Sequence, residues 1–393
     1  MGIDAGAGKA GETNVSTVYQ RLGLEPAVNA RGTYSDLGGS RLSPTVWRAM
    51  EESNGAFIEM EDLLQKSGAD IARMLDVEAA RVTPGVAASL ALCAAACVTR
   101  GDTRAIEKLP DTTGKPGEIL IQRGHRYKYA RCLKLAGVTL VEPDGDGPLT
   151  SAQFEAAISP RTAAIVLPAH LNGVDGTLGI EAVAAIARKH NVPLIVDAAY
   201  KVEPPAGIRS WYERGANIVC ISAKYFSGPN AGGFVFGHKK LIDWIAACDF
   251  TGFESSDYLT FGRVFKLDRQ IVVGVVEALR EWMTLDFDAR YRQYAEQAEN
   301  LARDLKDLPG LGLQRRFFTM EETLEQGPTN CLQVVLPKNI DPKSLMRGLS
   351  ARAPRVLVHA FEDSIAVAME TVLPGEEAIV GRRIKEELRA LAR

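Results

Sequence analysis

The sequence predicts an α/β protein: a main domain built on a mostly parallel sheet, followed by a smaller domain. From Val28 to about Leu285, short apolar β-like runs alternate with alanine-rich helical runs. Strand–helix–strand repetition with apolar strands is typical of a parallel sheet covered by helices on both faces. From about Asp286 a charged helical stretch opens a different pattern. A ligand of such a sheet is expected at the carboxyl ends of its strands.

The expected elements of the main domain follow in strand and helix order. Apolar runs predict strands at 118–122, 138–141, 163–167 and 192–197, and a further buried strand from Ile218 that leads to Lys224. Helical runs are expected at 86–98, 130–136, 154–158, 180–190 and 267–284. Residues 103–117, which contain Pro110 and the turn residues Asp111-Thr-Thr-Gly114, are expected to form an exposed surface loop.

Length and pattern together predict three regions. At 393 residues the chain can hold two domains, and its 46% hydrophobic and 24% charged residues are ordinary globular values. We expect an N-terminal arm at 1–24, a large domain at 25–285 and a small C-terminal domain at 286–393. The small domain should contain a helix at 291–308, strand-like runs at 331–336 and 355–359, and a final helix at 376–391.

Charge and cysteine usage exclude several classes of function. The net charge of -3 gives no basic surface, so nucleic acid is not an expected partner. Six cysteines without CxxC spacing favour small core residues of a reduced, cytoplasmic protein over a metal site. No apolar stretch reaches the length of a membrane span, and the first residues lack the apolar core of a signal peptide. We therefore expect a cytoplasmic protein with neither a membrane partner nor a metal.

Lys224 and Asp197 are the two most informative residues. Each stands at the end of an apolar run that reads as a buried strand, 27 positions apart. A lysine in such a place is costly unless its charge is used or its pKa is lowered. Pyridoxal 5'-phosphate needs this pair, because a lysine forms the imine and an acid keeps the pyridine nitrogen protonated. The sequence therefore predicts a pyridoxal-phosphate (PLP) site at the carboxyl edge of the sheet.

The segment Thr83-Pro-Gly-Val-Ala-Ala-Ser89 supplies a candidate phosphate site for that coenzyme. It is a tight turn that opens a helix, where free backbone N–H groups and the helix dipole suit an anion. The hydroxyl of Ser222 could reach the same phosphate, and Gly228-Pro-Asn-Ala-Gly-Gly233 adds a flexible turn after Lys224. The combination with Asp197 is far more specific than any one of these signals.

Two further side chains should lie at the same edge. Asn172 follows the strand at 163–167 and could hydrogen-bond the phenolic oxygen of the coenzyme, although a plain turn asparagine is an equal alternative. His125 follows the strand at 118–122 and could stack on the pyridine ring or move protons. His170 is a second choice for that role. Lys201, four residues after Asp197, is a rival to Lys224, but one strand exit is poorly placed to serve both ends of the ring.

Together these residues resemble fold-type I PLP-dependent enzymes, and more narrowly the selenocysteine synthase-like family that includes D-glucosaminate-6-phosphate ammonia-lyases. The resemblance spans about residues 25 to 390. It is carried by Val28-Asn-Ala-Arg-Gly-Thr33 with Leu37-Gly-Gly-Ser40, Val82-Thr-Pro-Gly85, Gln122-Arg-Gly-His125, Val196-Asp-Ala-Ala199, Ser222-Ala-Lys224 with Gly228-Pro229, and Gly262-Arg263 with Lys266. It implies a mostly parallel seven-stranded large domain and a small C-terminal α+β domain.

The resemblance also assigns roles. Lys224 would form the imine with the coenzyme, Asp197 would pair with the pyridinium, and Gly85, Val86, Ala87 and Ala88 would hold the phosphate. Family members are usually dimers with active sites at the subunit interface, so a homodimer or higher homo-oligomer is implied. Arg263 or Lys266 could then reach the neighbour's site, although a solvated helix start explains them equally well.

Two departures from the family pattern bear on the substrate. The subgroup tends to carry an arginine late in the small domain, where Ala368-Met-Glu-Thr371 stands here. Glu370 cannot clamp a substrate carboxylate, so Arg355 or Arg31 takes that role, or the substrate differs. Selenocysteine synthases also carry an added N-terminal region for tRNA, whereas the enzyme core is expected to start almost at once in this sequence, so tRNA is not an expected substrate.

The favoured reaction is that of a PLP-dependent lyase on a β-hydroxy amino acid or an amino sugar acid. Removal of the α-proton and loss of a β-hydroxyl would release a 2-keto acid and ammonia. A racemase or epimerase, with reprotonation by His125, Tyr127 or Tyr200, remains an alternative, as does an aminotransferase. A non-catalytic binding module is the option from another class, and the intact pair of Asp197 and Lys224 argues against it.

Overall fold

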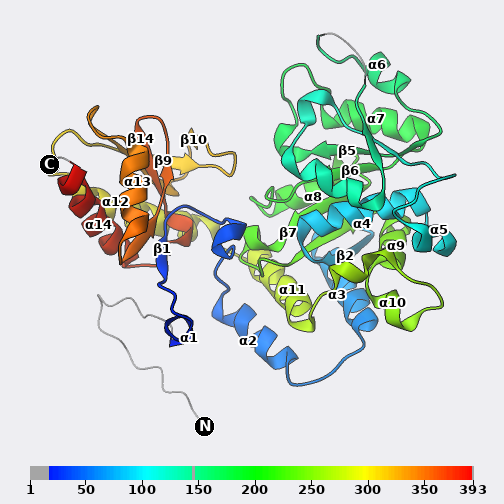
Figure 1. The fold of residues 1–393 in the computed structure, drawn as a ribbon, viewed down its shortest axis with the longest axis horizontal. Helices are drawn as coiled ribbons and strands as arrows, with labels where there is room; N and C mark the ends of the chain where they lie inside the picture. The colour runs from blue at the N-terminus through cyan, green and yellow to red at the C-terminus, as the bar shows by residue number, and fades with distance from the viewer. Residues whose placement is uncertain (1–16, 144–146, 392–393) are drawn as a thin grey trace. The chain divides into compact units, whose positions relative to one another are not determined.

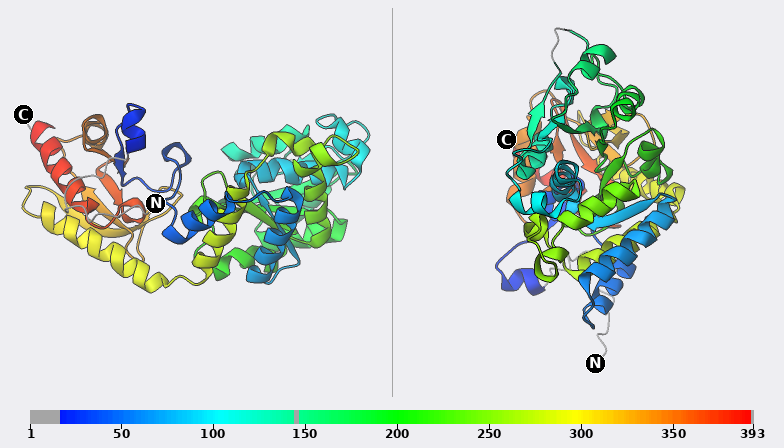
Figure 2. Two further views of the ribbon diagram at one scale, coloured as in Figure 1. Left: turned by 90° about the horizontal axis from the view of Figure 1, so that it is seen from below. Right: turned by 90° about the vertical axis from the view of Figure 1, so that its right-hand side faces the viewer.

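The computed structural model describes residues 17–143 and 147–391, and within this range the chain forms two compact units (Figures 1 and 2). The larger unit is Gly39–Leu285, and the smaller joins the chain up to Gly38 with everything from Asp286 onward. Residues 25–38, which the sequence analysis assigned to the large domain, therefore lie in the smaller unit. The reason is pairing: β1 (Ala27–Asn29) forms a parallel ladder with β12 (Arg355–Leu357).

The larger unit is built on a seven-stranded sheet with the strand order β2-β8-β7-β6-β5-β3-β4. The strand β8 runs opposite to the other six strands, which all run in one direction. The expected mostly parallel seven-stranded sheet is therefore confirmed. The strands are β2 (Ala79–Thr83), β3 (Glu118–Leu120), β4 (Thr139–Val141), β5 (Thr162–Pro168), β6 (Leu194–Asp197), β7 (Ile218–Ser222) and β8 (Gly233–Gly237).

Helices cover both faces of this sheet (Figure 2). The α-helices are α2 (Pro44–Ser53), α3 (Met60–Leu75), α4 (Gly85–Thr99), α5 (Thr103–Lys108), α6 (Ser151–Ala156), α7 (Ile180–His190), α8 (Ala206–Glu213), α9 (Lys239–Cys248), α10 (Thr251–Ser255) and α11 (Arg269–Met283). Short 3-10 helices are η2 (Arg123–His125), η3 (Lys128–Ala136), η4 (Ala169–Leu171), η5 (Ala223–Phe226) and η6 (Phe261–Phe265).

The segment expected to be an exposed loop at 103–117 instead begins with α5. Asp102 caps this helix, because its Oδ1 accepts a hydrogen bond from the backbone N–H of Arg104 at 3.1 Å. Ala105 and Ile106 are buried against the core, so the prediction missed a short amphipathic turn. The expected helix at 130–136 is present as the 3-10 helix η3.

Helix α4 is apolar on all sides and is buried between the sheet and its neighbours. It contacts β5, β7 and β8 as well as α9 and η3, and residues 88–99 are all buried. A helix that is hydrophobic all round belongs in a core rather than at a surface. Its N-terminus is thereby fixed at the carboxyl end of β2.

The smaller unit is an α+β body of its own. Its elements are α1 (Thr17–Arg21), β1, η1 (Ser35–Leu37), α12 (Phe287–Leu305), β9 (Gly312–Phe318), β10 (Leu324–Glu325), β11 (Cys331–Val335), α13 (Pro342–Ala351), β12, β13 (His359–Ala360), β14 (Ser364–Ala368), η7 (Met369–Thr371) and α14 (Glu376–Leu391). The antiparallel sheet β10-β9-β11-β14-β13 shares an apolar core with α12, α13 and α14. In the described part of the chain, no helix has the length and apolarity needed to cross a membrane.

Candidate active site

The carboxyl ends of β2, β3, β5, β6 and β7 meet along one edge of the larger unit's sheet, because these strands run in the same direction. The sequence-predicted residues Gly85, His125, Asn172, Asp197 and Lys224 follow these ends in turn. The antiparallel β8 begins at the same edge with Gly233, which pairs with Thr83 on one side and Ser222 on the other. The topology therefore places the candidate cofactor residues of this unit on one edge.

Asp197 is a buried acid held by neutral donors. It is 5% exposed, and among the described residues no cation forms an ion pair with it. Oδ2 accepts a hydrogen bond from the Tyr127 hydroxyl at 2.7 Å, and Oδ1 accepts one from the backbone N–H of Ala199 at 3.2 Å. Burial raises the pKa of this carboxyl, and the two hydrogen bonds oppose that rise. A cationic ligand group would supply the missing charge, as the protonated nitrogen of a pyridine ring does.

The N-terminus of α4 fits an anionic group. Gly85 has φ +76°, a conformation that favours glycine, and Pro84 before it provides no side-chain cap for the first N–H groups. The approach of β8 is close: a Cβ on Gly233 would lie 3.0 Å from Gly85 Cα and 2.6 Å from the Ile221 carbonyl oxygen. Free N–H groups at a helix N-terminus suit a phosphate. Of the other predicted phosphate residues, Val86 is buried and Ala87 exposed, on the first turn.

The sequence reasoning missed the hydroxyls that fix this turn. Ser89 Oγ lies 3.0 Å from the Gly85 carbonyl oxygen, to which it donates, and 2.7 Å from Thr83 Oγ1. Ser222, at the end of β7, is buried two strands away from Thr83 with only Gly233 between them in the register. Hydroxyl residues spaced around a Pro-Gly turn are the signal that could have identified this arrangement.

Lys224 lies in η5, directly after β7, and is only 9% exposed. Its Nζ lies 4.6 Å from the ring centroid of Tyr225. The following turn is tight, because the N–H of Gly228 donates to the Ala223 carbonyl at 2.8 Å and a Cβ on Gly228 would lie 2.9 Å from Ala223 Cβ. The rival Lys201 is half-buried beside the Tyr200 ring.

Two of the polar residues at this edge also hold neighbouring elements in place. Asn172 Oδ1 accepts a hydrogen bond from the backbone N–H of Ile180 at 2.8 Å, so it caps α7 and leaves its amide N–H groups for other partners. Gln122 bonds the backbone of Leu178 in both directions, at 2.7 and 2.9 Å. Its Nε2 also lies 3.3 Å from Nδ1 of His125.

His125 is completely buried, and its Nε2 is without a hydrogen-bond partner among the described residues. Burial lowers the pKa of this imidazole to about 4, so it is neutral near pH 7. His170, the second choice, is half-buried, and its ring centroid lies 5.6 Å from that of Tyr127 and 5.8 Å from that of Tyr200. The rings of Tyr127, His170 and Tyr200 are therefore neighbours, and Tyr127 connects this aromatic row to Asp197 through its hydrogen bond. The sequence analysis gave these tyrosines too small a role.

The four substrate candidates are divided between the two units. In the larger unit, Arg263 Nε forms an ion pair with Glu254 at 3.1 Å, and Lys266 is exposed. In the smaller unit, Arg31 pairs with Asp36 at 3.1 Å and lies over the Tyr34 ring, while Arg355 Nε donates to the Ser350 carbonyl at 2.9 Å.

Glu370, which stands where the family resemblance led us to expect an arginine, has a contact of its own in the smaller unit. Its Oε1 accepts hydrogen bonds from the backbone N–H and the hydroxyl of Thr33, both at 3.2 Å. It therefore holds the turn that carries Arg31. Gly32 in that turn has φ +115°, and a Cβ there would lie 3.1 Å from the same carboxylate oxygen.

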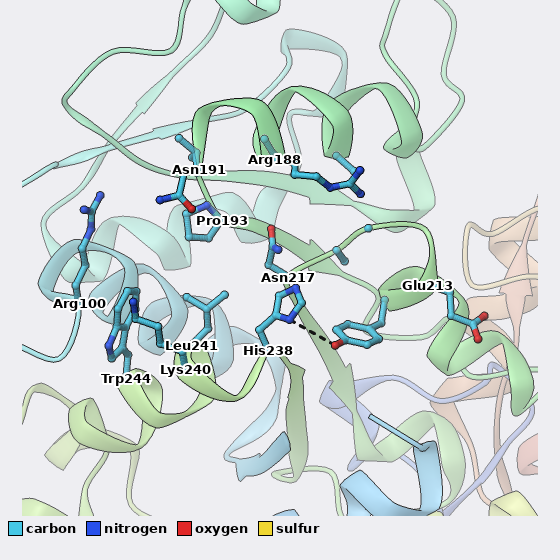
Figure 3. A pocket seen from close by; sticks show the side chains of 16 residues that line it. Arg100, Arg188, Asn191, Pro193, Glu213, Asn217, His238, Lys240, Leu241 and Trp244 are labelled. Atoms are coloured by element: carbon cyan, nitrogen blue, oxygen red, sulfur yellow. Dashed lines mark hydrogen bonds between the residues drawn. The ribbon is translucent and has the colours of Figure 1, made fainter. Parts of the chain in front are cut away.

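A cavity of about 700 Å³ lies at the opposite, amino edge of the sheet (Figure 3). Pro193 and Asn217, which precede β6 and β7, line it together with Trp244 of α9. Its cations Arg100 and Arg188 stand at the C-terminal ends of α4 and α7, where the helix dipole favours positive charge. The cavity holds none of the predicted site residues. Within the described ranges, no cluster of three His, Cys, Asp or Glu side chains could hold a metal.

Comparisons with known proteins show which family the chain resembles. Residues 112–203, from the loop before β3 through Asp197, match the DegT/DnrJ/EryC1/StrS aminotransferase family. A 5'-C-glycyluridine monooxygenase-decarboxylase from Streptomyces sp is 32% identical over 94% of this chain and 92% of its own. The D-glucosaminate-6-phosphate ammonia lyase of Salmonella typhimurium is 32% identical over 67% of this chain and 70% of its own.

More distant relatives and a solved structure complete the comparison. An L-seryl-tRNA(Sec) selenium transferase from Moorella thermoacetica is 23% identical over 94% of this chain and 83% of its own. A solved D-glucosaminate-6-phosphate ammonia-lyase superposes with a TM-score of 0.82 and 27% identity, covering 96% of this chain and 99% of that one. The chain belongs to the fold-type I pyridoxal-phosphate-dependent enzymes, in the selenocysteine synthase-like group that includes D-glucosaminate-6-phosphate ammonia-lyase.

Proposed function

We propose that this PLP-dependent enzyme is an ammonia-lyase acting on a β-hydroxy amino acid or an amino sugar acid. The observation that carries the proposal is the likeness to D-glucosaminate-6-phosphate ammonia-lyase, in sequence and over nearly the whole fold. The substrate would lose its α-proton and its β-hydroxyl, and hydrolysis would then release a 2-keto acid and ammonia. Bound PLP supplies an electron sink for the electron pair left at the α-carbon.

The residues of the larger unit divide the work as follows. Lys224 Nζ would hold the coenzyme covalently and, once the substrate amine has displaced it, accept the α-proton. Asp197 would face the pyridine nitrogen, and the N–H groups of Gly85, Val86 and Ala87 with the Ser222 hydroxyl would bind the phosphate. Asn172 would use its remaining amide N–H groups toward the phenolic oxygen. These roles fit an uncompensated buried acid and an uncapped helix N-terminus within the described residues.

Covalent attachment is tested by borohydride reduction of the purified protein with PLP, followed by peptide mapping. The label should map to Lys224 in the wild type and disappear in Lys224→Ala. Lys201→Ala is the matched control, because it removes the other lysine near the same edge and should keep the label. A label that persists in Lys224→Ala would overturn the assignment.

The reaction is tested with a panel of D- and L-β-hydroxy amino acids and amino sugar acids, including D-glucosaminate 6-phosphate. Appearance of keto acid and ammonia in equal amounts without an amino acceptor supports the lyase. Exchange of α-deuterium with inversion and no ammonia would instead identify a racemase or epimerase. Keto acid that appears only with a keto-acid acceptor would identify an aminotransferase.

A second candidate is oxidative decarboxylation of an amino acid. It is favoured by the similarity to the 5'-C-glycyluridine monooxygenase-decarboxylase, which extends over 94% of this chain at the same identity as the lyase. Oxygen uptake and carbon dioxide release separate the two, because the lyase reaction needs no oxygen and keeps the carboxylate. A substrate that gives ammonia equally well under argon would reject this candidate.

The homodimer remains part of the proposal. It is supported by large apolar side chains that this chain exposes on α2 and the segment leading to α3: Trp47 is 60% exposed, Phe57 94% and Ile58 55%. Sedimentation equilibrium should give twice the 42.5 kDa of the chain, and Phe57→Glu should shift the protein toward monomer. A wild-type monomer at micromolar concentration would contradict it.

A further inference from the structure

Tyr127 contacts both the candidate acid Asp197 and the aromatic row at the carboxyl edge of the sheet. Its hydroxyl lies 2.7 Å from Asp197 Oδ2; the acid is buried, and the tyrosine is partly buried against the core of the larger unit. The tyrosine comes from the residue that precedes η3, whereas the acid ends β6, so the contact joins segments 70 positions apart. Pairing of this kind is specified by the tertiary fold rather than by a local turn.

The hydroxyl is the donor in this contact. Burial and the neighbouring carboxylate raise the pKa of Tyr127 well above its usual value, so the phenol keeps its proton at every ordinary pH. Asp197 Oδ2 must therefore accept, and the neighbouring N–H of Ala199 is directed at the other oxygen. Two donors on a carboxylate stabilise its ionised form and fix its plane.

The other titratable groups around Asp197 do not compete for that role. Burial, and to a smaller extent the Asp197 charge, raise the pKa of the Cys132 thiol in η3, and Cys220 pairs with Asp197 in the register of β6 and β7. The ring centroid of His170 in η4 lies 5.6 Å from that of Tyr127. Among the described residues, the hydrogen bonds to the Asp197 carboxylate come from the Tyr127 hydroxyl at 2.7 Å and the Ala199 N–H at 3.2 Å, so the contact with Tyr127 is the shorter one.

We propose that Tyr127 is a positioning residue that keeps Asp197 ionised and oriented, so that the shared proton stays on the pyridine nitrogen of the coenzyme. The inference rests on the proposed function, in which that nitrogen meets Asp197. The proton can lie on the ring or on the carboxyl, and a donor to the carboxylate favours the ring. Without the phenol, the proton shifts toward Asp197 and the ring becomes a weaker electron acceptor.

The first test uses the protein without coenzyme and therefore does not depend on the proposed function. Burial raises the pKa of Asp197 in the folded state. The protonated carboxyl therefore does not reduce stability at low pH, whereas the fold loses stability as the pH rises past the pKa that this carboxyl has in the unfolded chain. Tyr127→Phe should increase that cost. The melting temperature of the variant should fall below wild type by more at about pH 8 than at about pH 4.

Tyr129→Phe is the matched control. Its ring centroid lies 6.2 Å from that of Tyr127, but the side chain is 49% exposed and makes no hydrogen bond to Asp197. Its melting temperature should differ from wild type by the same small amount at both pH values. If Tyr127→Phe behaved in the same pH-independent way, the hydroxyl would be a packing element only and the proposal would be wrong.

The second test locates the proton directly. The protein is loaded with PLP labelled with ¹⁵N in its ring, and the ¹⁵N chemical shift reports whether that nitrogen is protonated. Wild type and Tyr129→Phe should give the protonated signal, whereas Tyr127→Phe should shift toward the neutral one. Loss of a hydrogen bond to a charged group corresponds to about a tenfold change in proton affinity. An unchanged ring signal in Tyr127→Phe would overturn the proposal.

The two tests also separate this inference from the proposed function. A pH-dependent melting difference with an unlabelled Lys224 would leave the contact intact but show that the coenzyme binds elsewhere. A labelled Lys224 with unchanged pH dependence and ring signal would keep the coenzyme site and reject the role of Tyr127.

Discussion

Two aspartates of the larger unit are buried to the same extent, but they differ in whether a cation is paired with them. Asp249 and Asp197 are each 5% exposed. Asp249 is paired with the buried guanidinium of Arg81, whose Nε lies 2.5 Å from Oδ2, and Arg81 also binds Glu61 at 2.7 Å. Asp197 has only the neutral donors Tyr127 and Ala199, with no cation paired to it in the described residues.

The difference supports the proposal that Asp249 serves the fold and that Asp197 serves a ligand. An unpaired buried charge lowers the stability of the fold. An acid with a purely structural role is therefore expected to be paired with a cation from the same chain. Although burial lowers it, the two carboxylates raise the pKa of Arg81, and Arg81 in turn opposes the rise that burial causes in the pKa of Asp249. Within the described chain Asp197 lacks this complement, and the pyridinium of the bound coenzyme would supply it.

The largest expected effect is on catalysis. Asp197→Asn should lower kcat/KM by at least about a hundredfold, because the ring nitrogen loses the charge that holds its proton. Asp249→Asn makes the same isosteric change at the structural acid and should keep most of the activity per folded, PLP-loaded molecule. Steady-state rates of keto acid formation, normalised to bound PLP, measure both. Equal losses of activity in the two variants would show that Asp197 and Asp249 do not differ in their role.

The next effect is on stability. Arg81→Met should lower the free energy of unfolding by about 3–5 kcal/mol, because it leaves Asp249 buried without its cation. Arg280→Met removes a surface arginine, 46% exposed, that pairs with Asp70, and should cost less than about 1 kcal/mol. Urea denaturation followed by circular dichroism measures both. A small loss for Arg81→Met would mean that the network adds little to the fold.

A smaller effect of opposite sign is expected at the two acids in the absence of PLP. Asp197→Asn removes a charge that burial disfavours, so the unloaded variant should melt at or above the wild-type temperature near pH 7. Asp249→Asn should lose about 1–3 kcal/mol, because Arg81 keeps only part of its partners. Differential scanning calorimetry of the PLP-free proteins measures the pair. A less stable Asp197→Asn would indicate a structural role for that carboxylate too.

The smallest effect concerns Glu61 and acid pH. Its hydrogen bonds to Arg81 and Thr251 outweigh burial and lower its pKa from 4.5 to about 2. The folded-state pKa lies below the unfolded one, so this contribution is present above about pH 4.5 and is lost as the pH falls toward 2. The melting difference between wild type and Glu61→Gln should shrink over that window. Glu61 is 41% exposed, so solvent keeps the effect small.

Much of the larger unit could be predicted from the sequence. Helix α7 has the expected bounds, Ile180–His190, and β3 to β7 were anticipated because apolar runs and their spacing are local signals. The strands β2 and β8 were not singled out. The helix α5 was missed because two buried residues in a polar stretch give little periodicity. The place of β1 was missed because its partner β12 lies more than 300 residues away.

The candidate site divides in the same way. Asp197 and Lys224 could be singled out because a charged residue at the end of a buried strand is locally conspicuous. Tyr127 could not be given its place, because nothing in its own segment points to β6. The complete burial of His125 and the cap that Asn172 gives to α7 likewise depend on neighbours distant in the chain.

The amino-acid sequence by itself determined the class of protein: an α/β fold of a PLP-dependent enzyme, with a lysine and an acid at the ends of two strands as the proposed cofactor residues. Hydrophobic pattern and residue type act over a few positions, and they were enough for that. Only the tertiary structure decided which buried acid has a counterion and which has neutral donors. Burial and hydrogen-bond partners arise where distant segments pack, so the electrostatic state of Asp197 is a property of the fold.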